Sequence, residues 1–270
     1  MKRPSTPSSS LRSRLRPLLF PLLAVVILLA VFNGNQFDPD AVAKDLAQGR
    51  VEAALARLAS AEPDDLLPAL TGVHWWPQAN RTAALVQLAD QPIEDFLEDP
   101  SLPTLIAPLD RYRTPPTAIE LREGGPETLS LEVVHFELNL VATTEEIPPH
   151  NTTLPLEIRL LSGAGYTMAL RSPDGIYIAM AKFDLLTGAE TAKVEEAMTA
   201  TGHLSREPHG QKLLSAIVAL HFGLTAEALG LFEELESVPA FSKAARDLRI
   251  LTLREQGLDH SALGLLQTSR

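Results

Sequence analysis

The chain has 270 residues, of which 45% are hydrophobic, and this ordinary composition excludes a protein that is disordered throughout. The formal net charge is −11, and because residues 1–16 carry five basic side chains and no acid, subtracting these charges leaves −16 for the rest, which argues against nucleic acid as a partner. The absence of cysteine excludes disulfides, thiolate metal sites and a cysteine nucleophile.

The first predicted element is a transmembrane helix in residues 17–37, an uncharged stretch between Arg16 and Asp38. A run of this length can cross a bilayer core of about 30 Å. Basic residues precede the run and acidic residues follow it, so the positive-inside rule places residues 1–16, a short basic tail, in the cytoplasm. The sequence therefore predicts a single-pass membrane protein whose later residues lie outside the cytoplasm, in the periplasm if the host is Gram-negative.

A cleaved secretory signal is the alternative interpretation of this run, since it also begins with basic residues and an apolar core. A cleavage site would need an A-x-A-like pair of small residues. The end of the run, residues 28–34, contains no such pair and includes the bulky Phe32. We therefore favour a retained anchor, and a secreted binding protein remains the alternative.

Residues 38–112 are predicted to form a helical region. Asp38 is suited to cap the first helix, and a second helix is expected after Gly49. Further apolar residues recur at helical spacing as far as Leu109. The region is therefore expected to contain several short helices separated by Pro- and Asp-containing breaks.

Trp75 and Trp76, the only tryptophans in the chain, interrupt this helical series. A tryptophan pair can form an exposed docking patch for another protein. It can equally pack between helices, which is the interpretation we favour. The pair is thus a possible docking site.

Residues 113–186 are predicted to form a small antiparallel sheet of four or five strands, because apolar and polar residues alternate there. The residues between 143 and 153 are expected to form a polar surface loop. A turn at Pro173-Asp174-Gly175 joins the last two strands as a hairpin. The expected strands are residues 128–141, with a bulge near His135 and Phe136, then 154–161, 166–170 and 176–182.

Residues 187–270 are predicted to return to helix and contain an internal repeat. The segment 223–232 recurs as 257–266, at an offset of 34 residues. In each copy a glycine ends one helix, and an alanine five residues later lets the next helix pack closely. The residues expected to pack the two copies are Gly223, Ala228, Phe232, Gly257, Ala262 and Leu266.

This stretch, about residues 210–268, resembles the tetratricopeptide family, whose repeat has the same length. The turn and second helix of that motif match both copies, whereas the first helices lack the Trp, Leu-Gly and Tyr of the family pattern. Gly49 and Ala54 repeat the spacing near the N-terminus. The resemblance implies packed helical hairpins and, by analogy, a surface that holds another protein.

Motifs of the common enzyme classes are missing, including the G-x-S-x-G elbow, the phosphate loop, the dinucleotide fingerprint and H-E-x-x-H. His203 and His209 flank Glu207, but a spacing of six places neither histidine predictably as a ligand. No metal or other cofactor is therefore predicted. A hydrolase whose groups converge from distant segments, with His74 and His135 as candidates, remains an alternative function.

Together, the anchor, the helical repeat and the lack of a catalytic motif predict a non-enzymatic protein of the cell envelope. The expected fold class is α+β, with a transmembrane helix, a helical region, a small antiparallel sheet and C-terminal tetratricopeptide-like hairpins. The expected function is that of an interaction or assembly protein, held in the membrane by residues 17–37, which binds a protein partner through its hairpins and sheet.

Overall fold

A computed structural model shows a mixed α+β fold, which confirms the predicted class. The described residues from Pro39 onward form one compact unit. In the part of the chain that the structure describes, no helix is both long enough and apolar enough to cross a membrane. The predicted anchor, apart from Phe37, and the pair Trp75 and Trp76 lie outside the described residues. The described residues are 37–61, 85, 105–107, 110–122, 125–138 and 140–267.

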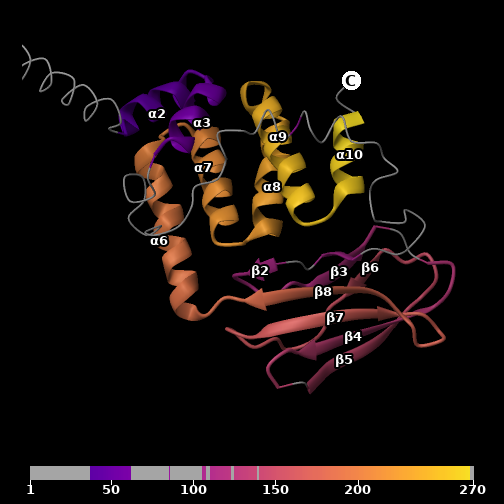
Figure 1. Ribbon diagram of the computed structural model, residues 1–270. Coiled ribbons are helices and arrows are strands. Elements are labelled where there is room, and N and C mark those ends of the chain that lie inside the picture. The colour runs from indigo at the N-terminus through magenta and orange to yellow at the C-terminus, as the bar shows by residue number, and fades with distance from the viewer. Residues whose placement is uncertain are drawn as a thin grey trace, which may run out of the picture. The chain divides into compact units, whose positions relative to one another are not determined.

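Seven helices occur among these residues. Helices α6 to α10 lie side by side in chain order, each packed against the one before it, and α2 and α3 form a hairpin that contacts α6, α7 and α9 (Figure 1). The helix bounds are α2 (Pro39–Ala47), α3 (Val51–Ala59), α6 (Gly188–Leu204), α7 (Pro208–His221), α8 (Thr225–Glu236), α9 (Pro239–Glu255) and α10 (Asp259–Gln267).

The turns that precede α3, α8 and α10 share one geometry. Their glycines, Gly49, Gly223 and Gly257, have φ of +67°, +73° and +72°, a region that glycine adopts without steric cost. In each turn the residue after the glycine donates its N–H to the carbonyl five residues earlier, at 2.8–2.9 Å. The alanine five residues after each glycine is fully buried. The three helical hairpins are therefore closed and packed in the same way.

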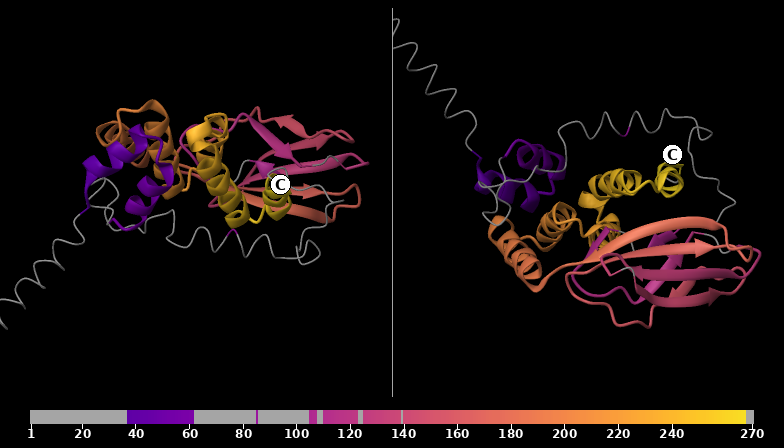
Figure 2. Two further views of the ribbon diagram at one scale, coloured as in Figure 1. Left: turned by 90° about the horizontal axis from the view of Figure 1, so that it is seen from above. Right: turned by 60° about the horizontal axis from the view of Figure 1, so that its bottom comes forward.

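Two sheets accompany the helices. The larger has the strand order β2-β8-β7-β4-β5 and the smaller β1-β3-β6. Figure 2 shows them together beside the helices α8 to α10. The strand bounds are β1 (Leu105–Ala107), β2 (Asp110–Tyr112), β3 (Ala118–Leu121), β4 (Leu129–His135), β5 (Leu140–Ile147), β6 (Thr153–Pro155), β7 (Gly165–Arg171) and β8 (Tyr177–Leu185).

A shared apolar core joins the two sheets. Ile119 of the smaller sheet belongs to the same buried cluster as Leu131, Met168 and Phe183 of the larger one. Along β4, every second side chain is buried and the others are half exposed. This alternation places one face of the larger sheet against the smaller sheet and the other face toward solvent.

The prediction of an antiparallel sheet is wrong for β2, which pairs in parallel with β8. Parallel neighbours need a long connection, and here the strands β3 to β7 intervene along the chain. The prediction of helix is also wrong for β1 and β2. Both are runs of only three residues, too short for periodicity to separate strand from helix.

Three further details of the predicted sheet are wrong. The expected single strand 128–141 is two strands, β4 and β5, separated by a turn that begins at Phe136; the irregular register between Val133 and Val134 lies close to the expected bulge near His135 and Phe136. The first part of the expected loop 143–153, as far as Ile147, belongs to β5, an edge strand, where polar residues are common. The expected strand 154–161 is reduced to β6, which ends at Pro155. The hairpin formed by β7 and β8 is confirmed.

Candidate functional site

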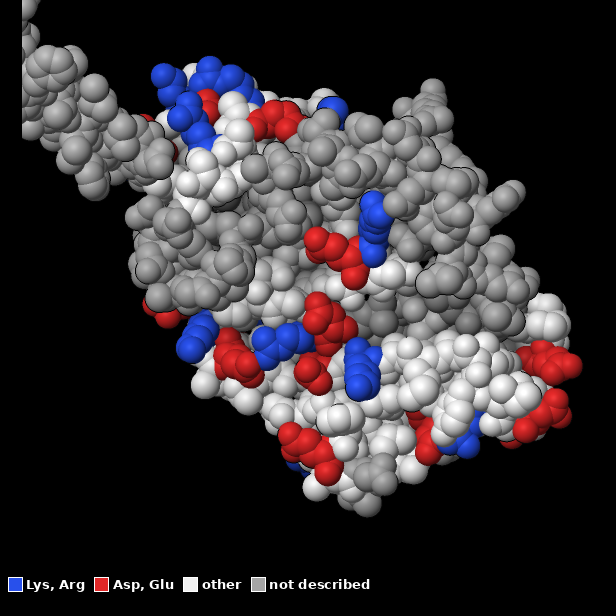
Figure 3. Space-filling model, in the orientation of Figure 1, with Lys and Arg blue, Asp and Glu red and all other residues white. Residues whose placement is uncertain are grey.

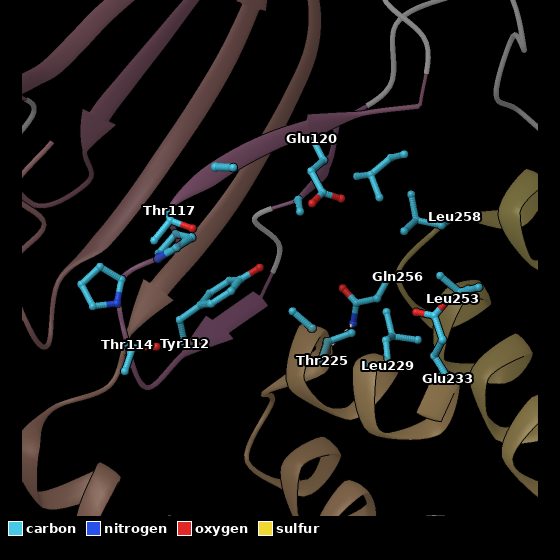
Figure 4. Close-up of a pocket in the computed structure, with 17 residues that line it drawn as sticks. Tyr112, Thr114, Thr117, Glu120, Thr225, Leu229, Glu233, Leu253, Gln256 and Leu258 are labelled. Carbon is cyan, nitrogen blue, oxygen red and sulfur yellow. Dashed lines mark hydrogen bonds between the residues drawn. The ribbon is translucent and has the colours of Figure 1, made fainter. Parts of the chain in front are cut away.

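An open cleft of about 540 Å³ lies between the helices and the smaller sheet. One wall is formed by β1, β3 and the segment 113–117, and the other by α8 and the turn between α9 and α10 (Figure 4). Its volume is in the range of pockets that bind ligands, about 300–1,000 Å³. Among its apolar lining residues are Ile106, Ala107, Pro115, Pro116, Leu229, Leu253 and Leu258.

The sheet wall follows from the alternation along β3. Ile119 and Leu121 are buried in the core between the sheets. Successive side chains of a strand point to opposite faces, so Ala118 and Glu120 lie on the outer face and line the cleft. Glu120 is exposed, and within the described ranges it makes no ion pair. The strand therefore presents a carboxylate to the cleft.

Four polar side chains point into the same space from both walls: Tyr112, Glu120, Glu233 and Gln256 (Figure 4). Glu233 is 67% exposed and lies 3.4 Å from the guanidinium of Arg249. Among the described residues that line the cleft, two are acidic and none is basic. The charge of the cleft is therefore negative.

Strand β2 fixes the helical wall relative to the sheets. The backbone N–H of Arg111 donates to the carbonyl of Gly223 at 3.0 Å, and its guanidinium pairs with Glu190. Arg113 forms a second ion pair with Glu227 of α8. Acidic and basic side chains are correspondingly interspersed where the helices meet the sheets (Figure 3). The contacts of Arg111 and Arg113 thus hold the two walls of the cleft in position.

Asp110 is the most unusual residue at this junction. Its φ of +67° is in the left-handed region, which few residues other than glycine adopt. Its carboxylate accepts a hydrogen bond of 2.6 Å from the hydroxyl of Thr225, which also accepts one of 3.3 Å from the side chain of Gln256. Burial raises the pKa of Asp110, although the bond from Thr225 opposes this. A polar chain therefore leads from β2 to the cleft.

The substitution Asp110→Asn is expected to raise the free energy of unfolding at pH 7. The folded pKa of Asp110 lies above its ordinary value of 3.8, so ionisation costs stability as the pH rises through the folded pKa. Asparagine tolerates the left-handed region and still accepts the hydrogen bond from Thr225. Urea unfolding from pH 3 to pH 8 tests this. A variant that is less stable at pH 7 would contradict it.

Ionised Glu190, unlike ionised Asp110, is expected to stabilise the folded protein. The backbone N–H of Thr187, the guanidinium of Arg111 and the hydroxyl of Thr187 lower its pKa from 4.5 to about 2. This contribution is complete above pH 4.5 and is lost as the pH falls toward 2. Because the side chain is 40% exposed, Glu190→Gln is expected to cost no more than about 1 kcal/mol at pH 7.

Acid titration of unfolding measures this difference, because the glutamine can keep the helix cap and only the charge is lost. Wild type and Glu190→Gln should converge near pH 2. The substitution Glu196→Gln, at an exposed position of the same helix, is the matched control and should follow wild type at every pH. A gap that persists unchanged at low pH would show that the charge is not responsible.

The six repeat residues predicted from the sequence do not line this cleft; they hold its helical wall together. Ala228, Phe232 and Ala262 are fully buried, whereas Leu266 is partly exposed at the edge of a smaller cluster. Gly223 also contacts β2 through its carbonyl. The sequence reasoning missed the lining residues themselves. Nothing local in the sequence marks Pro115, Pro116, Glu120 or Gln256 as residues that line a cleft.

Three of the histidines considered as ligands or catalytic groups, His135, His203 and His209, do not line the cleft. His203 is in the last turn of α6, and His209 is the second residue of α7, where its N–H donates to the capping carboxylate of Glu207. His135 is buried, and its Nδ1 accepts the N–H of Leu138 at 3.3 Å. His74 is outside the described residues. In the described ranges, no three His, Asp or Glu side chains are grouped to hold a metal ion.

No protein-family model matches the chain, and no curated protein matches it. The geometry of the cleft, with walls contributed by both the helices and the smaller sheet, therefore carries the functional inference.

Proposed function

We propose that the protein is a membrane-anchored interaction or assembly protein of the cell envelope, and that it binds a partner protein in the cleft. The observation that carries this proposal is the cleft itself, which draws its walls from the C-terminal hairpins and from the smaller sheet. The apolar run of residues 17–37 and the basic residues before it support anchoring with an extracytoplasmic C-terminal region.

The helical hairpins support a binding role. Their common glycine turns and buried alanines are typical of tetratricopeptide-like stacks, which use grooves between elements to hold partners. The ion pairs of Arg111 and Arg113 hold the two walls before a partner arrives. Preorganised walls lower the entropy cost of binding, so this arrangement suits a recognition surface.

Site-specific photo-cross-linking of the full-length chain in the cells that produce it tests the proposal. A photoreactive amino acid is placed at Ala118 or Ala226, one on each wall of the cleft. The control position is Glu196, which is exposed on α6 and does not line the cleft. We expect a discrete protein adduct from both cleft positions and none from the control. Absence of an adduct, or the same adduct from all three positions, would exclude the cleft as a partner site.

The anchor requires a separate measurement. We expect the protein to stay with the membrane fraction after alkaline carbonate extraction and its intact mass to include residues 1–37. A mature form that lacks these residues would instead support the cleaved secretory signal. The cross-linking result does not depend on this outcome.

A further inference from the structure

We infer that the cleft binds a short segment of the partner in which a Lys or Arg side chain is flanked by apolar residues. This inference rests on the proposed function and names the chemistry of the partner. It is supported by the negative charge of the cleft, by its apolar walls and by the side-chain oxygen of Gln256, which accepts no hydrogen bond from a described residue.

The charge of the cleft favours a cation as its ligand. Two carboxylates, Glu120 and Glu233, face the cleft, and no basic residue is among its described lining residues. The partial neutralisation of Glu233 by Arg249 is weak, because their closest atoms are 3.4 Å apart and Glu233 is mostly exposed. Glu120 has no ion-pair partner in the described part of the chain. A cleft lined by charge of one sign concentrates the opposite charge, which here is a cation.

The apolar walls decide which kind of cation fits. Pro115, Pro116, Leu229 and Leu253 offer hydrocarbon surface beside the carboxylates. A Lys or Arg side chain buries its methylene stem along such a surface while its charged end reaches an acid. A hydrated metal ion would leave the same surface exposed to water. The lining therefore suits a basic side chain with apolar neighbours.

The polar chain at the back of the cleft suits a peptide backbone. The side-chain amide of Gln256 donates to Thr225, so its carbonyl oxygen is directed elsewhere, with no donor to it among the described residues. This oxygen can accept an N–H from the bound segment. The cleft is about 540 Å³, so it accommodates a few residues rather than a folded domain.

Selection from a random seven-residue peptide library displayed on phage tests this inference. The target is the full-length chain in mild detergent, and the best peptides are then synthesised for affinity measurement. We expect selected sequences to be enriched in Lys or Arg next to apolar residues and their binding to weaken with salt. Glu120→Gln should lower the affinity about tenfold, and Glu233→Gln should lower it less, because Arg249 already shares that charge.

Glu157→Gln is the matched control, since Glu157 is exposed and does not line the cleft, and it should leave affinity unchanged. Circular dichroism should show the same melting for Glu120→Gln and wild type, because Glu120 is exposed and makes no described ion pair. The inference is overturned if selection yields no peptides, if the selected peptides lack basic residues, or if Glu120→Gln binds them as tightly as wild type. If the cleft positions cross-link to a partner but the selected peptides are neutral, only this inference is overturned. If no cross-link forms and no peptide is selected, the proposed function is overturned as well.

Discussion

The substitution Phe232→Ala is expected to lower the free energy of unfolding by about 3–5 kcal/mol. The side chain of Phe232 is 0% exposed in α8, which packs between α7 and α9. Its removal leaves a cavity among helices held by their neighbours, so the site cannot collapse fully. Urea unfolding of the full-length protein, followed by far-UV circular dichroism, should show a lower midpoint with an unchanged slope.

Leu266 supplies the internal control, because it occupies the equivalent position 34 residues later in the repeat. It is only partly buried against the smaller cluster of α9 and α10. Leu266→Ala is therefore expected to cost about 1 kcal/mol, since little apolar surface is returned to water. Equal losses at the two positions would mean that the two copies are packed alike, contrary to the structure.

The helical hairpins were predictable because their signals are local. Gly49, Gly223 and Gly257 end helices in a conformation that glycine prefers, and the spacing to the next alanine is visible in the sequence. The starts of α7 and α9 are marked by Pro208 and Pro239 in the first turn. These features depend on a few neighbouring residues, so a single sequence contains them.

Strand β2 was not predictable in this way. Its three residues carry no periodic pattern, and its partner β8 is separated from it by five other strands. Strand β5 was missed for a different reason. Its one neighbour is β4, and its polar residues, among them Glu145 and Glu146, face a solvated edge, so the alternation that marks a half-buried strand is weak.

The cleft could not be derived from the sequence because it depends on the placement of two distant segments. Alternation along β3 predicts that Glu120 faces away from the core, but not what it faces. The helical period likewise assigns Leu229 and Glu233 to the less buried side of α8. The contact of β2 with the turn before α8, and the packing of Ile106 in β1 against the cluster of α9 and α10, bring these two outer faces together. The contact between β2 and the turn before α8 therefore connects the fold to the proposed binding site.

Gly223→Ala tests that connection and is expected to cost about 2–4 kcal/mol. One part of the cost is the φ of +73°, which alanine rarely adopts. The other part is steric, because a Cβ at this position would lie 3.0 Å from Cδ of Arg111 and 3.1 Å from Oδ1 of Asp110. These groups must move, which disturbs the contact between β2 and the turn before α8. Hydrogen exchange should therefore increase in β2 and at the start of α8, in addition to the loss measured by urea unfolding.

Gly257→Ala separates the two parts of this cost. Its φ of +72° is nearly the same, but a Cβ there meets nothing within 4 Å, so only the backbone cost of about 1–2 kcal/mol is expected. In an Arg111→Ala background the Cδ atom is absent, and Gly223→Ala should then cost less than it does in wild type. Two results would show that the close approach of β2 to the α7–α8 turn contributes nothing to the fold. One is an equal loss of stability for Gly223→Ala and Gly257→Ala. The other is a double variant of Gly223→Ala and Arg111→Ala whose loss of stability equals the sum of the two single losses.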